Sequence, residues 1–166
     1  MEIKKISNLS MLLALSIVFS IIESFIPVIG GIIPGVKLGL ANTVIIFVIY
    51  MYSFKDALFI SILRVFLVGL LRTGLFNITF FFSLAGAFLS VFVMYLMKKY
   101  TKLSVVGISV MGALFHSIGQ ILMGMLILKT MSLIYYLPYI LIFSIPTGII
   151  VGMASKTVLS YYKDRL

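Results

Sequence analysis

The chain has 166 residues, of which 63% are hydrophobic and 10% charged, and its mean hydropathy is +1.28. Soluble domains carry about 25% charged residues, so this composition excludes a soluble protein. The lack of cysteine excludes disulfides and thiolate metal sites. The net charge of +9 is assigned to lysines and arginines at the ends of membrane spans, and not to nucleic-acid binding. At this length we expect a single domain over residues 1–166.

Charged residues and helix breakers divide the chain into six apolar runs. Each run is near the ~20 residues that a helix needs to cross a bilayer. The runs cover residues 7–26, 38–54, 57–74, 76–97, 104–128 and 133–158. They are almost continuously apolar and lack the alternation of a membrane β-barrel strand. The sequence therefore predicts an all-α membrane bundle of six transmembrane helices.

Basic residues gather at one end of the predicted bundle. The cytoplasmic ends of membrane proteins are enriched in Lys and Arg, which predicts a multi-pass cell-membrane protein with both termini in the cytoplasm. The residues on this side are Lys4, Lys5, Lys55, Lys98, Lys99, Lys102, Lys156, Lys163 and Arg165, against Lys37, Arg72 and Lys129 on the other. The uncharged connection 27–36, rich in Gly and Pro, is predicted to be a loop or lid on the outer face.

The first two predicted helices carry polar residues near their outer ends. Glu23 lies near the end of the first run, and Lys37 opens the second run on the same side. Asn42 lies about one turn deeper in the second helix. These residues are candidates for ligand contacts. The alternative for Glu23 is a structural ion pair with Lys37 or Arg64.

The third run contains the most informative residue, Arg64, in an otherwise apolar stretch. A lone cation at the bilayer centre costs roughly 2.5–3.5 kcal/mol on insertion scales. That cost implies a partner, which is an internal anion, water in a cavity or an anionic ligand. Of the four acidic residues in the chain, only Glu23 lies at comparable depth, so an anionic ligand is the favoured hypothesis. Arg72 lies eight residues further on, roughly on an adjoining face, and is interpreted as an interfacial residue that snorkels.

The fourth and fifth runs add aromatic and polar groups. Residues 76–82 form an aromatic cluster, interpreted as lipid-facing or core-filling, with an apolar-ligand pocket as the alternative. In the fifth run, Gly112, His116, Gln120 and Gly124 recur every four residues and form one stripe with a polar centre. Interhelical hydrogen bonding is the alternative role for His116 and Gln120. We expect a single pocket, open to the outside, that gathers Glu23, Lys37, Asn42, Arg64, His116 and Gln120.

Two helices carry small residues spaced four apart, a pattern that lets backbones approach closely. In the sixth run the stripe is Ser144, Gly148 and Gly152, and in the first run it contains Ser10 and Ala14. Such a stripe serves internal packing when it faces the bundle and becomes an interaction surface when it faces lipid. The sequence leaves the direction of both stripes open.

The residue inventory argues against catalysis by this chain. Gly30 and Gly35 have the spacing of a P-loop, but Lys37 comes one place late and no hydroxyl follows. The four acidic residues are far apart, so they form no carboxylate cluster that would hold Mg²⁺ against a diphosphate. One histidine without cysteine predicts no transition-metal site. We therefore expect a protein that is not an enzyme and uses no cofactor.

Several of these segments resemble the Gx transporter family, also catalogued as heptaprenyl diphosphate synthase component I. The resemblance covers about residues 7–160, and the segment Lys37-Leu-Gly-Leu-Ala-Asn42 is its most specific part. The other segments are 23–27, Arg64, 82–86 and 116–120. That family in turn resembles the substrate-binding (S) subunits of energy-coupling-factor (ECF) transporters, which are six-helix membrane proteins of this size.

The resemblance implies a mechanism and partners. An S subunit captures a small-molecule substrate near the outer face and docks on a transmembrane coupling subunit driven by two cytoplasmic ATPases. Docking typically uses Ala-x-x-x-Ala in the first helix, and the matching positions here are Ser10, Ala14 and Val18. The main hypothesis is such a subunit for a small, partly anionic ligand, isoprenoid- or quinone-related. The alternatives are a membrane anchor or assembly subunit of a heptaprenyl diphosphate synthase and an autonomous small transporter.

Overall fold

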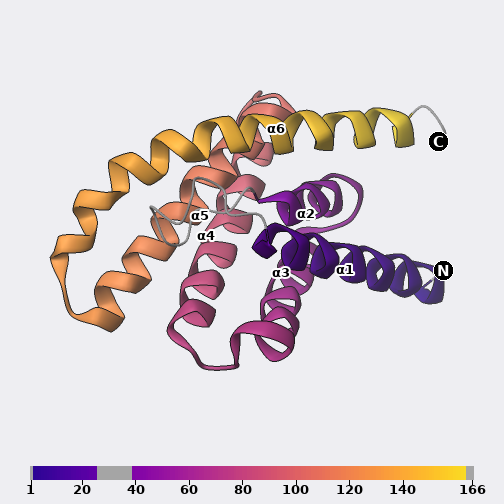
Figure 1. The fold of residues 1–166 in the computed structure, drawn as a ribbon. Helices are drawn as coiled ribbons and strands as arrows, with labels where there is room; N and C mark the ends of the chain where they lie inside the picture. Colours follow the sequence, from indigo (N-terminus) through magenta and orange to yellow (C-terminus); the bar gives the residue numbers. More distant parts are fainter. Residues whose placement is uncertain (1, 26–38, 164–166) are drawn as a thin grey trace.

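The computed structural model describes residues 2–25 and 39–163. Within these ranges the chain forms six α-helices and no β-strand, which confirms the predicted all-α fold (Figure 1). The helices are α1 (Glu2–Phe25), α2 (Leu40–Met51), α3 (Phe54–Val68), α4 (Ile78–Tyr100), α5 (Val105–Leu128) and α6 (Leu137–Lys163). A π-helical turn, η1 (Gly69–Thr73), extends α3, and a 3₁₀ segment, η2 (Met131–Tyr136), leads into α6.

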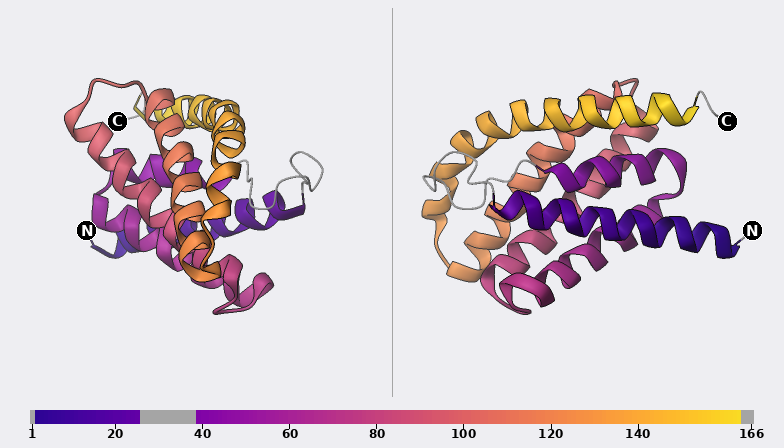
Figure 2. Two further views of the ribbon diagram at one scale, coloured as in Figure 1. Left: turned by 90° about the vertical axis from the view of Figure 1, so that its left-hand side faces the viewer. Right: turned by 45° about the vertical axis from the view of Figure 1, so that its right-hand side comes forward.

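The centre of the bundle is α2, which lies between α1 and α6 (Figure 2). Its residues 44–49 are all buried, and Ile45, Ile46 and Val48 are completely so. A helix that is apolar on every face is stable where other helices surround it. Met94 of α4 and Ile108 of α5 complete this core. The first described residues of α1 and the last of α6 lie at the same end of the molecule (Figure 1).

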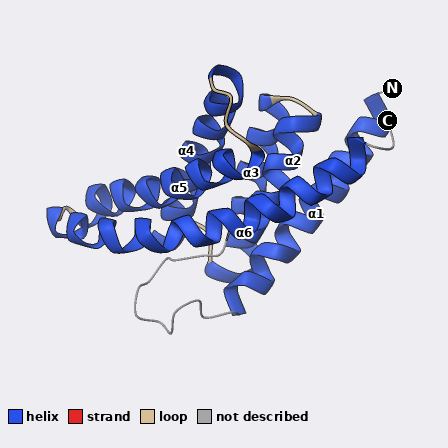
Figure 3. Ribbon diagram, turned by 90° about the horizontal axis from the view of Figure 1, so that it is seen from above, coloured by secondary structure: helices blue, strands red, loops and turns tan. Residues whose placement is uncertain are grey.

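Four described helices are long and apolar enough to cross a membrane: residues 3–23, 78–100, 105–128 and 131–162. This is the composition of a membrane protein. The other two predicted runs, 38–54 and 57–74, form shorter helices of 12 and 15 residues, α2 and α3. In α2 the burial comes from the surrounding helices, so a spanning length is not needed to shield its apolar surface. The connection 27–36 lies outside the described residues. Figure 3 shows how uniformly helical the described chain is.

Hydrogen bonds from polar side chains mark where several helices begin or end. Hydropathy alone predicts these bounds only approximately. Ser53 and Asp56 form a capping box at the start of α3, in which each side chain receives a hydrogen bond from the other residue's backbone N–H. Ser104 caps α5 by accepting a hydrogen bond from the backbone N–H of Gly107. Lys98 Nζ donates to the carbonyl oxygen of Ile49 at 2.6 Å, in the last turn of α2. These bonds satisfy backbone groups that the helices leave unpaired at their ends.

Candidate ligand-binding pocket

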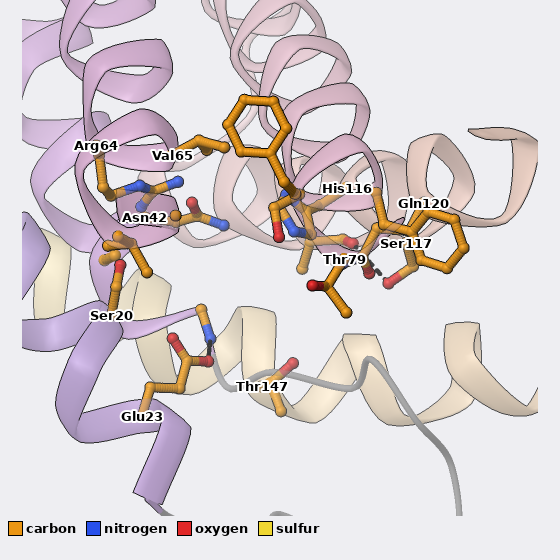
Figure 4. A pocket seen from close by; sticks show the side chains of 18 of the residues that line it. Ser20, Glu23, Asn42, Arg64, Val65, Thr79, His116, Ser117, Gln120 and Thr147 are labelled. Atoms are coloured by element: carbon orange, nitrogen blue, oxygen red, sulfur yellow. Dashed lines mark hydrogen bonds between the residues drawn. The ribbon is translucent and has the colours of Figure 1, made fainter. Parts of the chain in front are cut away.

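A cavity of about 260 Å³ lies among the helices, and all six of them and η1 contribute to its walls (Figure 4). This volume is just below the range for ligand pockets, about 300–1,000 Å³. The lining residues are Ser20, Glu23, Gly39, Ala41, Asn42, Arg64, Val65, Val68, Gly69, Arg72, Thr79, Phe80, Phe82, Ser83, Ala113, His116, Ser117, Gln120, Ser144 and Thr147.

The cavity gathers five of the six residues proposed from the sequence as ligand contacts: Glu23, Asn42, Arg64, His116 and Gln120. They come from α1, α2, α3 and α5. The sixth, Lys37, lies outside the described residues. In Figure 4, Arg64, Asn42 and Glu23 lie toward one end of the pocket, and His116 and Gln120 toward the other. The charged side chains of Arg64 and Glu23 therefore lie at the opposite end of the cavity from the polar side chains that α5 contributes.

Arg64 is 6% exposed, and its guanidinium lies on the cavity wall. The Glu23 carboxylate, itself 5% exposed, attracts it electrostatically. A buried cation loses its hydration, and the cavity beside Arg64 is where water or an anion can restore that stabilisation. The pocket therefore combines a buried positive charge, a nearby carboxylate that offsets part of that charge, and open space beside them.

Gly39 fixes the position of the Glu23 carboxylate. Its backbone N–H donates a hydrogen bond to Oε1 of Glu23, and this bond joins the end of α1 to the start of α2. Gly39 has φ +76°, in the left-handed region that favours glycine. This conformation of Gly39 orients its N–H group toward Glu23 and so holds the carboxylate at the edge of the pocket. Asn42, three residues after Gly39, lines the same pocket from α2.

Close contact between α4 and α5 places His116 and Gln120. A Cβ added at Gly86 would lie 2.8 Å from the carbonyl oxygen of His116 and 3.0 Å from Cγ of Gln120. A Cβ added at Gly119 would lie 2.8 Å from the carbonyl oxygen of Ala85. The two helices therefore meet at glycine surfaces, and His116 and Gln120 of α5 line the pocket where this contact is made.

The pocket is also lined by six hydroxyl groups that were not predicted from the sequence as ligand contacts. They belong to Ser20, Thr79, Ser83, Ser117, Ser144 and Thr147. Ser117 and Ser144 are joined by a hydrogen bond of 2.7 Å between their Oγ atoms, which connects α5 to α6. Ser117 lies one residue after His116, and Ser144 and Thr147 flank Pro146, which interrupts the α6 hydrogen-bond ladder. For Ser144 and Thr147, the position beside a helix-interior proline was the signal in the sequence.

The aromatic cluster at residues 76–82 divides in the structure. Phe80 is 3% exposed and lines the pocket with Phe82, whereas Phe76 is 71% exposed. The lipid-facing or core-filling interpretation therefore omits the pocket role of Phe80 and Phe82. Arg72, interpreted from the sequence as an interfacial residue, also lines the pocket while its side chain stays exposed.

The small residues of α1 lie away from the pocket. Ser10, Ala14 and Val18 are all exposed, and together with Met11 and Leu15 they form an apolar outer face of α1. The direction of this stripe, which the sequence left open, is outward. The α6 stripe, by contrast, is buried.

Among the described residues, no three His, Cys, Asp or Glu side chains lie close enough to hold a metal ion. The side chains that line the pocket can recognise a ligand by charge and hydrogen bonding. It contains one guanidinium at depth, one at an exposed position, a carboxylate, two amides, an imidazole and several hydroxyls.

A family model described as heptaprenyl diphosphate synthase component I matches residues 12–158. The chain belongs to the heptaprenyl diphosphate synthase component I family. The matched range contains every residue that lines the pocket, and it confirms the resemblance to this family that the sequence segments indicated. No curated protein and no solved structure matches the chain.

Proposed function

We propose that this chain is a membrane subunit that binds a small ligand with an anionic group in the pocket beside Arg64. The observation that carries the proposal is the buried guanidinium on the wall of an open cavity. Such a charge costs roughly 2.5–3.5 kcal/mol near the bilayer centre. A carboxylate or phosphate group of the ligand would offset that cost.

Each predicted site residue has a role in this proposal. Arg64 binds the anionic group, and Glu23, held by Gly39, orders the guanidinium. Asn42, His116 and Gln120 would orient the neutral part of the ligand by hydrogen bonds. Lys37, which precedes Gly39 by two residues, is proposed as a further cation of the site.

The family match favours a role as the membrane subunit of an isoprenoid synthase system, because the family description names a heptaprenyl diphosphate synthase component. In this role the chain would assemble with a synthase at the membrane. The cavity limits what it holds, because a heptaprenyl chain is far too large for about 260 Å³. The ligand would be a small isoprenoid or quinone-related precursor.

The second candidate is the substrate-binding subunit of an ECF-type uptake transporter. It is favoured by the exposed α1 stripe of Ser10, Ala14 and Val18, at the position where such subunits dock. The partners would be a transmembrane coupling subunit and two cytoplasmic ATPases. The basic end of the bundle, with both termini, would lie in the cytoplasm, and the pocket would fill from the outer face.

Copurification from native membranes separates the two systems. If the synthase role holds, a prenyl synthase copurifies with the chain, and a coupling subunit with ATPases does not. If the uptake role holds, the coupling subunit and ATPases copurify, and Ala14→Trp removes them because a bulky ring blocks the α1 face. Ala154→Trp, at an exposed small residue of α6, is the matched control.

Arg64→Gln tests the part that both systems share. We expect this variant to abolish the rise in thermal unfolding midpoint that small anions give the purified chain. The protein partners that copurify with the chain should remain bound. If small anions raise the unfolding midpoint of this variant as much as that of the wild type, the proposed pocket is wrong. Transport of a substrate in liposomes without ATP or any partner would instead indicate an autonomous transporter.

A further inference from the structure

The π-helical turn η1 places a second arginine on the pocket wall that bears Arg64. In a regular α-helix, residues eight apart are rotated by about 80° relative to each other, because 3.6 residues make one turn. The turn at Gly69–Thr73 begins five residues after Arg64, and its i→i+5 hydrogen bonding rotates the chain less per residue. The wider turn therefore brings Arg72 back toward the face of α3 that carries Arg64, and both line the cavity.

The two arginines lie at different depths. Arg64 is 6% exposed, whereas the side chain of Arg72 is exposed. The guanidinium of Arg72 lies 4.8 Å from the centre of the Phe25 ring, at the last residue of α1. A guanidinium on an aromatic face keeps its positive charge. The contact with Phe25 thus holds a positive charge on the exposed side of the pocket.

The charges of the pocket favour an anion. Among the described residues that line it, Arg64 and Arg72 contribute two positive charges and Glu23 one negative charge. The walls therefore carry one surplus positive charge when His116 is neutral. An anionic group of the ligand would offset that surplus, and the neutral part of the ligand would reach the amides and hydroxyls of the other helices.

We propose that Arg72, positioned by the π-helical turn and the Phe25 ring, is a second ligand-binding cation that attracts a small anion at the pocket mouth and passes it to Arg64. This inference rests on the proposed function, because it assumes that the pocket binds an anionic ligand. A positive group at the rim of a binding site mainly increases the association rate and the salt dependence of binding. Arg64, which is buried, supplies most of the affinity.

The test uses the full chain purified in detergent and three probes that share one ring and differ in charge: benzoate, phenyl phosphate and benzamide. The thermal unfolding midpoint is followed as each probe is titrated at low and at high salt. The variants are Arg72→Gln, Arg72→Lys and Arg64→Gln. Leu71→Ala, at an exposed neighbour in the same turn, is the matched control.

We expect benzoate to stabilise the wild-type chain more than benzamide does. Arg72→Gln should weaken apparent benzoate affinity by roughly threefold to fivefold at low salt, the size expected for an exposed charge pair. The loss should disappear at high salt, where exposed charges are screened. Arg72→Lys should keep much of the salt dependence, and Leu71→Ala should match the wild type. Arg64→Gln should weaken binding at least about thirtyfold at either salt concentration.

The outcomes separate the two proposals. If benzoate binds and Arg72→Gln binds it as tightly as the wild type at low salt, the role of Arg72 is wrong and the anion pocket stands. If neither benzoate nor phenyl phosphate stabilises the wild type more than benzamide does, the anion pocket itself is wrong. Stronger protection by phenyl phosphate than by benzoate would support the anion pocket and indicate a phosphate group as its ligand.

Discussion

The α1 and α6 helices carry similar stripes of small residues and use them in opposite ways. On α6, Gly148 and Gly152 are buried against α5. A Cβ added to them would lie 2.8 Å from Cα of Val110 and 2.7 Å from Cα of Val106, respectively. On α1, Ala14 and its neighbours in the stripe are exposed. One stripe is therefore part of the internal packing, and the other is an outer surface.

This difference follows from the position of each helix in the bundle. α6 packs along α5, whereas α1 contacts α2 and α3 at the edge of the molecule. In the apolar 18-residue stretch of each helix, 33% is buried inside the molecule in the α6 segment and only 11% in α1. The same residue spacing therefore stabilises the fold in one helix and leaves a face available to a partner or lipid in the other.

The largest effect is expected from Gly152→Ala. The added methyl group would overlap the backbone of Val106, and overpacking of this kind costs typically 1–3 kcal/mol. The free energy of unfolding in mixed micelles measures the loss. The control is Ala154→Val, which adds bulk at an exposed position of the same helix and should have little effect. Equal stability of Gly152→Ala and the wild type would contradict the tight α5–α6 contact.

A smaller effect is expected from Ser144→Ala, on the inward stripe at the pocket. Ser144 Oγ donates to the carbonyl oxygen of Ile140 at 2.8 Å and is hydrogen-bonded to Ser117. When Ser144 donates to Ile140, the single Ser117 proton joins the two helices, and in Ser144→Ala it can turn to the Ala113 carbonyl oxygen 3.2 Å away, so the loss should be about 1 kcal/mol. Ser160→Ala, at an exposed serine of α6 with a similar local bond, should change stability less. Comparable losses in the two variants would mean that the α5–α6 hydrogen bond contributes little.

The ion pair between Lys5 of α1 and Asp56 of α3 should make the free energy of unfolding depend on pH. Lys5 Nζ lies 2.8 Å from Oδ2 of Asp56. Partial burial alone would raise the pKa of Asp56, but hydrogen bonds from Lys5 and Ser53 and the charge of Lys5 outweigh it and lower the pKa below 3.8. A carboxylate with a lowered folded-state pKa stabilises the protein at neutral pH, and this contribution is lost as the pH falls through that pKa.

Lys5→Gln should therefore remove a stabilisation that the wild type has at neutral pH and loses below about pH 4. The pair is partly exposed, so the contribution should be at most about 1 kcal/mol. Unfolding measured from neutral to acidic pH checks this. Lys4→Gln, at the neighbouring exposed lysine, is the control. An identical pH profile for Lys5→Gln and the wild type would show that this ion pair does not stabilise α1.

The smallest effect on stability is expected from Ala14→Trp, on the outward stripe. Substitutions at an exposed position usually change the free energy of unfolding by no more than about 0.5 kcal/mol. The indole ring would extend into lipid or detergent. A loss as large as that of Gly152→Ala would show that α1 packs against the bundle more closely than its exposed face indicates.

Hydropathy and charge determined much of this protein at the level of sequence. Runs of apolar residues specify membrane helices because every backbone polar group must be satisfied within the helix. The polar residues Glu23, Asn42, Arg64, His116 and Gln120 stood out for the same reason, since each is costly in an apolar medium. Their common pocket could be predicted because few such residues exist in the chain.

Tertiary structure decided what depends on the rotation of each helix about its axis and on its neighbours. The opposite directions of the Ala14 and Gly152 stripes, the hydroxyl-lined wall around Ser144 and the return of Arg72 to the pocket face through a π-helical turn were not evident from spacing. Local periodicity defines which residues share a face of a helix. Which neighbour that face meets is decided by packing among segments far apart in the sequence.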